Sequence, residues 1–264
     1  MQGLDRELHE LQNAVREAGR QVMDLAEKGF EITIKPDRSP VTSADLTVNR
    51  ILKDGLGQVF PDIGWLSEET PDNAARMEQK RVWVVDPIDG TKYFMDRVPE
   101  FAISVALVEA GRGILAAVFN PATDELFSAV RGAGATLNGA AIRIGAEART
   151  PPLVLIAPPA FRRGRFRSLE RKAEFRPMGS IAYTLALVAA GKADAAINLG
   201  RMHEWDVAGG VLLIEEAGGM VVDTEGAPFL FNKADTSVSG IVAGQPAVVR
   251  KARGWIASLP QAKR

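Results

Sequence analysis

Two aspartates set three residues apart end an apolar stretch of the chain. The segment VWVVDPIDGT, residues 82–91, begins like a buried strand and then runs into Asp86, Pro87 and Asp89. We expect the strand to hold Asp86 in a fixed position at its end. Pro87 would stiffen a turn that brings Asp89 back beside Asp86. Two carboxylates so close together repel each other unless cations lie among them, so the pair could be shared by two metal ions.

Other acidic residues lie at the ends of predicted elements. Glu68 and Glu69 follow the apolar run GWLS, Asp206 follows Trp205 at a predicted helix start, and Asp45 lies in the first turn of another helix. Taken singly, these are ordinary helix N-terminal charges or solvated loop residues. Taken together, they are a set of hard oxygen ligands, which favours Mg²⁺ over softer metals.

The residues that follow Asp89 add an anion-binding element. Gly90 and Thr91 begin a predicted helical turn, whose free N–H groups suit a phosphate oxygen. Carboxylates, a hydroxyl and a helix start are the parts needed for metal-assisted hydrolysis of a phosphate ester. The ligand expected from this set is a small phosphorylated metabolite.

Composition narrows the alternatives. The 264 residues carry a formal net charge of −1, so no overall field draws the protein to nucleic acid or to a membrane. The absence of cysteine excludes disulfides, thiolate metal sites and a cysteine nucleophile, and two histidines are too few for a histidine-rich metal site. No signal-peptide core and no apolar run of roughly 18 residues is present, so we expect a cytoplasmic protein.

The hydrophobic pattern changes near residue 149. Residues 1–149 predict two amphipathic helices packed on a largely antiparallel sheet, and residues 150–264 predict alternating strands and helices of an α/β half. The first half carries most of the candidate ligands, and the second carries Asp206 and the elements expected to set substrate specificity. Since no long linker separates them, we expect one compact unit with a ligand cleft between the halves.

At this level of detail the chain resembles the inositol monophosphatase superfamily. The blocks DPIDGT and WDVAGG match its paired signature, and KPDRSPVTSAD, GWLSEET and GAGATLNG follow its further blocks in order. The resemblance covers most of the chain. It implies a layered α-β-α-β-α sandwich, an α+β or α/β fold, and a phosphoric monoester hydrolase that uses Mg²⁺, is inhibited by Li⁺ and forms a homodimer.

The resemblance also assigns metal ligands. It implies that Glu68, Asp86 and the backbone carbonyl of Ile88 bind one Mg²⁺, and that Asp86, Asp89 and Asp206 bind a second. A third, weaker Mg²⁺ is implied near Glu68.

Catalytic and phosphate-binding roles come from the same resemblance. Thr91, oriented by Asp45, would help to deprotonate the attacking water, with Glu68 as a further catalytic residue. The N–H groups of Gly90 and Thr91 would hold the phosphate, and Asp206 would complete the substrate site.

The motifs favour two substrates. SPVTSAD and GTKYF resemble 3′(2′),5′-bisphosphate nucleotidases, which convert adenosine 3′,5′-bisphosphate to AMP, and this is the favoured prediction. ELFSAVRGAGATLNG and HEWDVAGG are more similar to inositol-1-monophosphatases, and Asn198 stands in the region where those enzymes commonly present a glutamate. Histidinol phosphate and fructose 1,6-bisphosphate remain further alternatives. A regulatory protein of the same fold that acts on transcription complexes is the alternative from another functional class.

The segment FRRGRFRSLERK, residues 161–172, is the densest basic run. A solvated helix face is the simpler interpretation. The alternative is that Arg162, Arg163 or Arg165 contacts the second phosphate of a bisphosphorylated substrate. Lys92 could likewise contact the substrate or only cover its loop, and we expect His203 to be a structural or rim residue.

Overall fold

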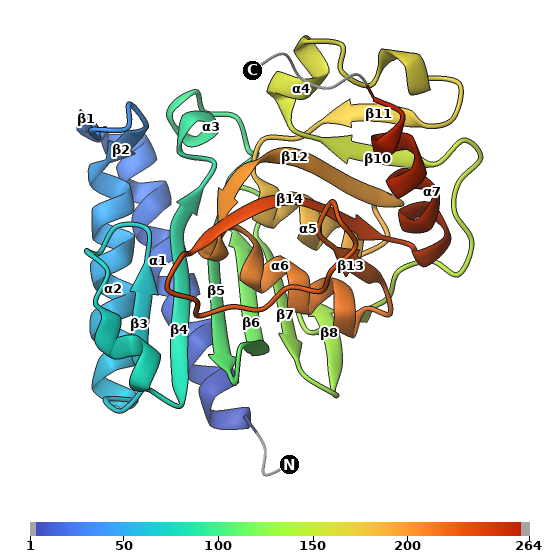
Figure 1. Cartoon of the computed structure of the whole chain (residues 1–264). Helices are drawn as coiled ribbons and strands as arrows, with labels where there is room; N and C mark the ends of the chain where they lie inside the picture. The colour runs from blue at the N-terminus through green and yellow to red at the C-terminus, as the bar shows by residue number, and fades with distance from the viewer. Residues whose placement is uncertain (1–3, 260–264) are drawn as a thin grey trace.

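The protein is a sandwich of five layers in the order α-β-α-β-α, as Figure 1 shows. The structure is a computed structural model that describes residues 4–259. Two sheets lie on either side of a central helical layer, and each sheet is covered on its outer face by further helices. The predicted fold class is therefore confirmed.

The helices and strands follow the chain in simple order. The helices are α1 (Asp5–Lys28), α2 (Ser43–Val59), α3 (Thr91–Met95), α4 (Pro158–Arg162), α5 (Ile181–Ala189), α6 (Glu204–Glu216) and α7 (Pro246–Ala257). Short 3₁₀ turns cover Ala74–Glu78 and Arg167–Leu169. The strands are β1 (Ile32–Ile34), β2 (Pro40–Thr42), β3 (Gly64–Ser67), β4 (Arg81–Asp89), β5 (Ala102–Glu109), β6 (Arg112–Asn120), β7 (Glu125–Val130), β8 (Gly134–Leu137), β9 (Ala140–Ile142), β10 (Leu153–Ile156), β11 (Glu174–Pro177), β12 (Ala195–His203), β13 (Met220–Val222) and β14 (Ser237–Gly244).

The larger sheet has the strand order β3-β4-β5-β6-β7-β8-β9. Strands β3 and β4 are parallel, and the other neighbours are antiparallel, as the sequence predicts for this half. Because side chains alternate along a strand, Trp83 and Val85 of β4 pack against α1 and α2, whereas Val82 and Val84 face α5 and α6. Coverage of both faces explains why β4 is apolar without interruption.

The smaller sheet has the order β11-β10-β12-β14-β13. Leu153 and Leu155 of β10 join the core shared with the larger sheet, and Val154 and Ile156 face outward to the core under α7. Helices α5 and α6 thus fill the space between the sheets (Figure 1).

Helix α1 illustrates how the outer layer is held. Leu11, Val15, Ala18 and Val22 form one buried stripe at helical spacing, with charged residues on the opposite face. Among the helices of residues 4–259, none combines the length and apolar character that a bilayer span requires.

Two local expectations differ from the structure. The DPID segment does not leave the sheet as a free turn, because β4 continues to Asp89 and its register with β5 shifts between Asp86 and Asp89. The basic run 161–172 does not form one continuous helix, but most of its arginines and Lys172 are exposed to solvent, as predicted. Helix α4 ends at Arg162, Gly164 has a φ of 61°, and Phe166 and Leu169 turn into the outer core.

The contact between α5 and α6 requires glycine at one position. A Cβ on Gly210 of α6 would lie 2.5 Å from the Cβ of Leu185. We therefore expect Gly210→Ala to lower the free energy of unfolding by about 1–3 kcal/mol through overpacking, measured by urea denaturation. The matched control is Gly55→Ala in α2, where nothing lies within 4 Å of the new methyl. That change should raise the free energy of unfolding by about 0.5–1 kcal/mol, and equal effects of the two changes would contradict the packing assigned to Gly210.

Candidate active site

Carboxylates from distant parts of the chain meet at one edge of the larger sheet. Glu68 follows β3 and Asp86 lies near the end of the parallel strand β4, so both reach the same edge, and Asp206 lies in the first turn of α6. One carboxylate oxygen from each of these three residues lies within 4.8 Å of the other two. The three side chains line a hollow of about 250 Å³ together with Asp89 and Thr91.

Asp86 is the most buried of these acids, with 1 % of its surface exposed. Its Oδ1 atom has no hydrogen-bond partner among the described residues. Burial, together with the charges of Glu68 and Asp89, raises the pKa of Asp86 well above its usual value, and burial beside Asp89 does the same to the pKa of Asp206. An unpaired buried acceptor among crowded carboxylates fits a hard divalent cation such as Mg²⁺.

Asp89 is held by the N-terminus of α5. Its Oδ2 atom accepts hydrogen bonds from the Ser180 hydroxyl at 2.5 Å and from the Ala182 N–H at 2.6 Å. Burial raises the pKa of Asp89 to about 6 despite these bonds. The sequence analysis did not single out Ser180, although a serine before the apolar run of α5 is a typical N-cap.

Lys35 is a second residue that the sequence analysis missed. It comes from the connection between β1 and β2, and its Nζ donates to Glu68 Oε1 at 2.8 Å and to Glu69. Burial alone lowers the pKa of Lys35, but the bonds to the two glutamates outweigh it and raise the pKa to about 12. One ammonium group does not balance the charge of the four carboxylates in the hollow.

Asp45 serves both as a helix cap and as a partner of Thr91. Its Oδ2 atom accepts from the N–H and the hydroxyl of Thr42 at 2.8 and 2.6 Å, which closes a capping box at the start of α2. Its Oδ1 atom lies 3.0 Å from Thr91 Oγ1, which is also 3.1 Å from the carbonyl oxygen of Ile88. The Thr91 hydroxyl therefore has two acceptors for its own proton, and Thr91 lines the hollow.

Position 90 requires glycine because of its backbone conformation and its close neighbours. Its φ is 95°, and a Cβ at this position would lie 2.8 Å from the carbonyl oxygen of Glu100. Only glycine therefore allows the chain to turn from β4 into α3, where Thr91 is the first residue.

The tentative substrate contacts lie in different places. Lys92 is exposed and lines the hollow beside Tyr93. Burial and Glu100 raise the pKa of Tyr93, whereas the neighbouring Arg162 guanidinium lowers it. Arg162 itself lines a separate hollow.

The other tentative residues do not line this hollow. Arg163 belongs to a separate hollow in the C-terminal half, and Arg165 is half-buried with no hydrogen-bond partner for its Nε among the described residues. Asn198 accepts a hydrogen bond from the Gly200 N–H at 2.8 Å, at an irregular point of β12. Substrate contacts by these three residues stay predictions.

His203, the last residue of β12 and the N-cap of α6, supports Asp206. Its backbone N–H donates to Asp206 Oδ2 at 2.7 Å, and its ring stacks on Trp205 with 4.5 Å between centroids. Burial, followed by the charge of Arg201, lowers the pKa of His203. These contacts agree with the structural role that the sequence predicts.

Comparisons with known proteins point to one family. The model of the inositol monophosphatase family matches residues 5–257. An inositol-1-monophosphatase of Rhizobium meliloti is 38% identical over 230 residues, covering 83% of this chain and 86% of that protein. The Nus factor SuhB of Escherichia coli is 34% identical, with 92% and 94% covered, and a 3′(2′),5′-bisphosphate nucleotidase CysQ of Escherichia coli is 35% identical, with 81% and 89% covered. The crystal structure of the extragenic suppressor protein SuhB from Bartonella henselae superposes with a TM-score of 0.86 at 29% identity, covering 96% of this chain and 99% of that one.

The buried charge of Asp89 predicts a pH-dependent stability in the metal-free protein. The pKa of about 6 lies above the value of about 3.9 in an unfolded chain, so the folded state binds more protons between these limits. Stability is therefore lost as the pH rises through this window. In EDTA at pH 8, the Asp89→Asn variant should have a higher melting temperature than the wild-type protein. This difference in melting temperature should shrink towards pH 4.5.

Thermal unfolding at the two pH values measures the effect, with Asp54→Asn on the exposed face of α2 as control. A melting difference for Asp89→Asn that does not change with pH would contradict the assignment.

Proposed function

This chain belongs to the inositol monophosphatase family and is a phosphomonoester hydrolase, and from this premise we propose that it releases the 3′-phosphate of a nucleoside 3′,5′-bisphosphate in an Mg²⁺-dependent reaction. The observation that carries the metal dependence is the unpaired, buried Oδ1 atom of Asp86 within the cluster of Glu68, Asp86 and Asp206. Members of the family are generally metal-dependent. The choice of a substrate with two phosphates is inferred from the cationic side chains near the hollow.

We assign the ligands to two or three Mg²⁺ ions as follows. Glu68, Asp86 and the Ile88 carbonyl would hold one ion, and Asp86, Asp89 and Asp206 a second. A weaker third ion would lie near Glu68. When bound, Mg²⁺ supplies Lewis-acid activation of water and stabilises the charge on the leaving oxygen.

Thr91 and Asp45 form the proton-accepting pair of the proposal. Thr42 fixes Asp45 Oδ2, so that Oδ1 stays directed at the Thr91 hydroxyl. Thr91 can then accept a hydrogen bond from the attacking water while passing its own proton towards Asp45, whose pKa burial raises. Glu68 faces the same hollow and is the further acidic group available for proton transfer.

The phosphate would lie against the start of α3. The turn at Gly90 directs the backbone there, and the N–H groups of Gly90 and Thr91 are the proposed donors to phosphate oxygens. Asp206, which also lines the hollow, would contact the remainder of the substrate.

The rim of the hollow supports a substrate with a second phosphate. A second phosphate cannot lie near the carboxylates and needs cations at a distance from them; Lys92 lines the hollow, and Arg162 neighbours Tyr93, which also lines it. Arginine can bind a phosphate with two parallel hydrogen bonds. Inositol 1-phosphate is the alternative substrate, favoured by the 38% identity to an enzyme of that name, and it would leave Arg162 without a phosphate to bind.

Removal of the Thr91 hydroxyl should slow the chemical step. We expect Thr91→Val and Asp45→Asn each to lower kcat by about 10²- to 10⁴-fold, the range of general acid–base catalysis, with little change in KM. The double variant should be hardly slower than either single variant, because the two residues act as one unit. The rate of phosphate release measures these changes in kcat. Thr47→Val, in the same helix as Asp45, is the control. Multiplicative losses in the double variant would contradict a shared role.

The substrate is tested by comparing adenosine 3′,5′-bisphosphate with inositol 1-phosphate, with and without Li⁺. For the bisphosphate, Arg162→Ala should raise KM about tenfold or more, since a hydrogen bond to a charged group contributes about 1.5–3 kcal/mol. It should leave inositol 1-phosphate kinetics unchanged, as should the control Arg171→Ala for both substrates. A wild-type preference for inositol 1-phosphate would replace the nucleotidase proposal by the alternative.

A further inference from the structure

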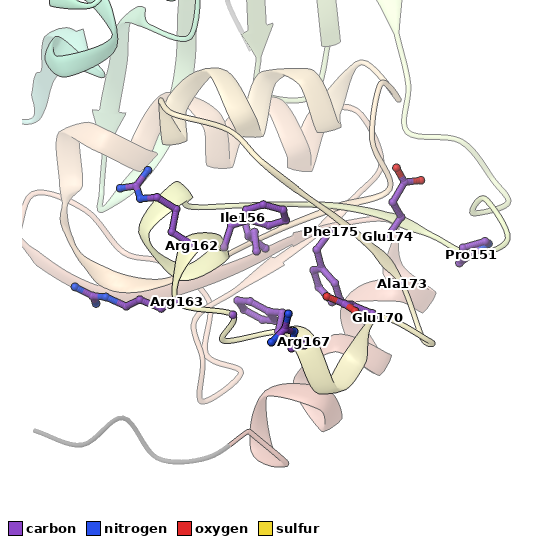
Figure 2. Close-up of a pocket in the computed structure, with 12 residues that line it drawn as sticks. Pro151, Ile156, Arg162, Arg163, Arg167, Glu170, Ala173, Glu174 and Phe175 are labelled. Atoms are coloured by element: carbon purple, nitrogen blue, oxygen red, sulfur yellow. The ribbon is translucent and has the colours of Figure 1, made fainter.

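A second hollow lies in the C-terminal half, on the outer face of the smaller sheet. Its volume is about 720 Å³, and it is bounded by α4, the 3₁₀ turn Arg167–Leu169 and β11 (Figure 2). It shares no lining residue with the hollow of the acidic cluster. Its size is in the range of small-molecule sites, and Arg162 is the one lining residue that the proposed hydrolysis uses.

The floor of this hollow is aromatic. Phe166 stacks on Phe175 with 5.0 Å between ring centroids and an angle of 28°. Phe166 is 3% exposed and belongs to the outer core, whereas Phe175 is half-buried and Phe161 is 46% exposed. The last two rings thus offer apolar surface that a planar ligand could cover, and Phe166 fixes the position of one of them.

The charges around the floor are divided between two sides. Arg162 and Arg163 extend from α4 away from Phe175, while Glu174 lies on the opposite side, as Figure 2 shows. Glu174 is paired with Arg176 at 2.7 Å. Arg162, Arg163 and Arg167 form no ion pair within residues 4–259, so their guanidinium groups are available to an external anion.

We propose that this hollow binds a small aromatic anion of the nucleoside monophosphate class. The base would lie against Phe161 and Phe175, and the phosphate would lie on the arginine side, towards Arg163 and Arg167. A planar guanidinium matches two phosphate oxygens, and Glu174 on the other side disfavours the reverse orientation. The site is independent of the proposed hydrolysis and of its metal ions.

Arg162 gives this site a physical connection to the acidic hollow. It lines the second hollow and also lies beside Tyr93, which lines the first. A phosphate held near Arg163 adds negative charge close to the contact between Arg162 and Tyr93. Binding at the second hollow needs no metal, whereas binding of a product at the acidic hollow would need it, so the metal dependence of binding distinguishes the two sites.

The test is equilibrium dialysis of the full-length protein with radiolabelled AMP as probe, in Mg²⁺ and in EDTA. We expect saturable binding in both conditions, since the metal-free acidic hollow repels anions and the second hollow needs no metal. Arg167→Glu and Phe175→Ala should weaken binding tenfold or more. Arg250→Glu, an equal change of charge on the exposed face of α7, should have no effect. Adenosine alone and inorganic phosphate alone should each bind at least tenfold more weakly than AMP.

Three results would overturn the proposal. The first is binding that requires Mg²⁺ and is lost in Asp206→Asn, which would place AMP only at the acidic hollow as a product. The second is unchanged affinity in Arg167→Glu, whose side chain is exposed and whose replacement leaves the core intact. The third is binding of a short oligoribonucleotide without any binding of AMP. None of these results bears on bisphosphate hydrolysis, which is measured separately.

Discussion

The mutual repulsion of buried carboxylates is the constraint on which the rest of the structure depends. Glu68, Asp86, Asp89 and Asp206 line one small hollow, and the half-buried Lys35 pairs with Glu68 alone of these four. Burial raises the pKa values of the three aspartates, which is the expected response of a site that lacks its counter-charge. Without bound cations, such a cluster lowers the stability of the folded state. A cation-binding function therefore best explains its presence in the fold.

The layered fold opposes this repulsion by fixing each acid from a separate rigid element. The parallel ends of β3 and β4 carry Glu68 and Asp86, and the start of α6 carries Asp206. Ser180 at the start of α5 holds Asp89 across the boundary between the two halves of the chain. Because α5 and α6 lie in the central layer between both sheets, the site is completed only when the whole sandwich has formed.

Local patterns in the sequence predicted much of this arrangement. The apolar run before Asp86, the helix N-terminal charges of Asp45 and Asp206 and the acids at element ends all follow from short-range rules, and the family blocks supplied the roles. The sequence could not show that Lys35 pairs with Glu68, since 33 residues separate them and the pairing depends on the β1–β2 connection. It also predicted one solvated helix over residues 161–172, where burial of Phe166 and Leu169 interrupts the helix although most of the basic side chains are exposed as predicted. The contact of Arg162 with Tyr93 is likewise a product of tertiary packing alone.

The most direct measurement is calorimetric titration of Mg²⁺ into the metal-free protein at pH 6 and pH 8, in buffers of different ionisation enthalpy. Cation binding to carboxylates with raised pKa values must release protons, and this release should be larger at pH 6 than at pH 8. We predict saturable binding of two or more ions, with this pH-dependent proton release, and its loss in Asp86→Asn. Binding without proton release at pH 6, or binding that Asp86→Asn leaves unchanged, would contradict the account of the acidic cluster as the metal site.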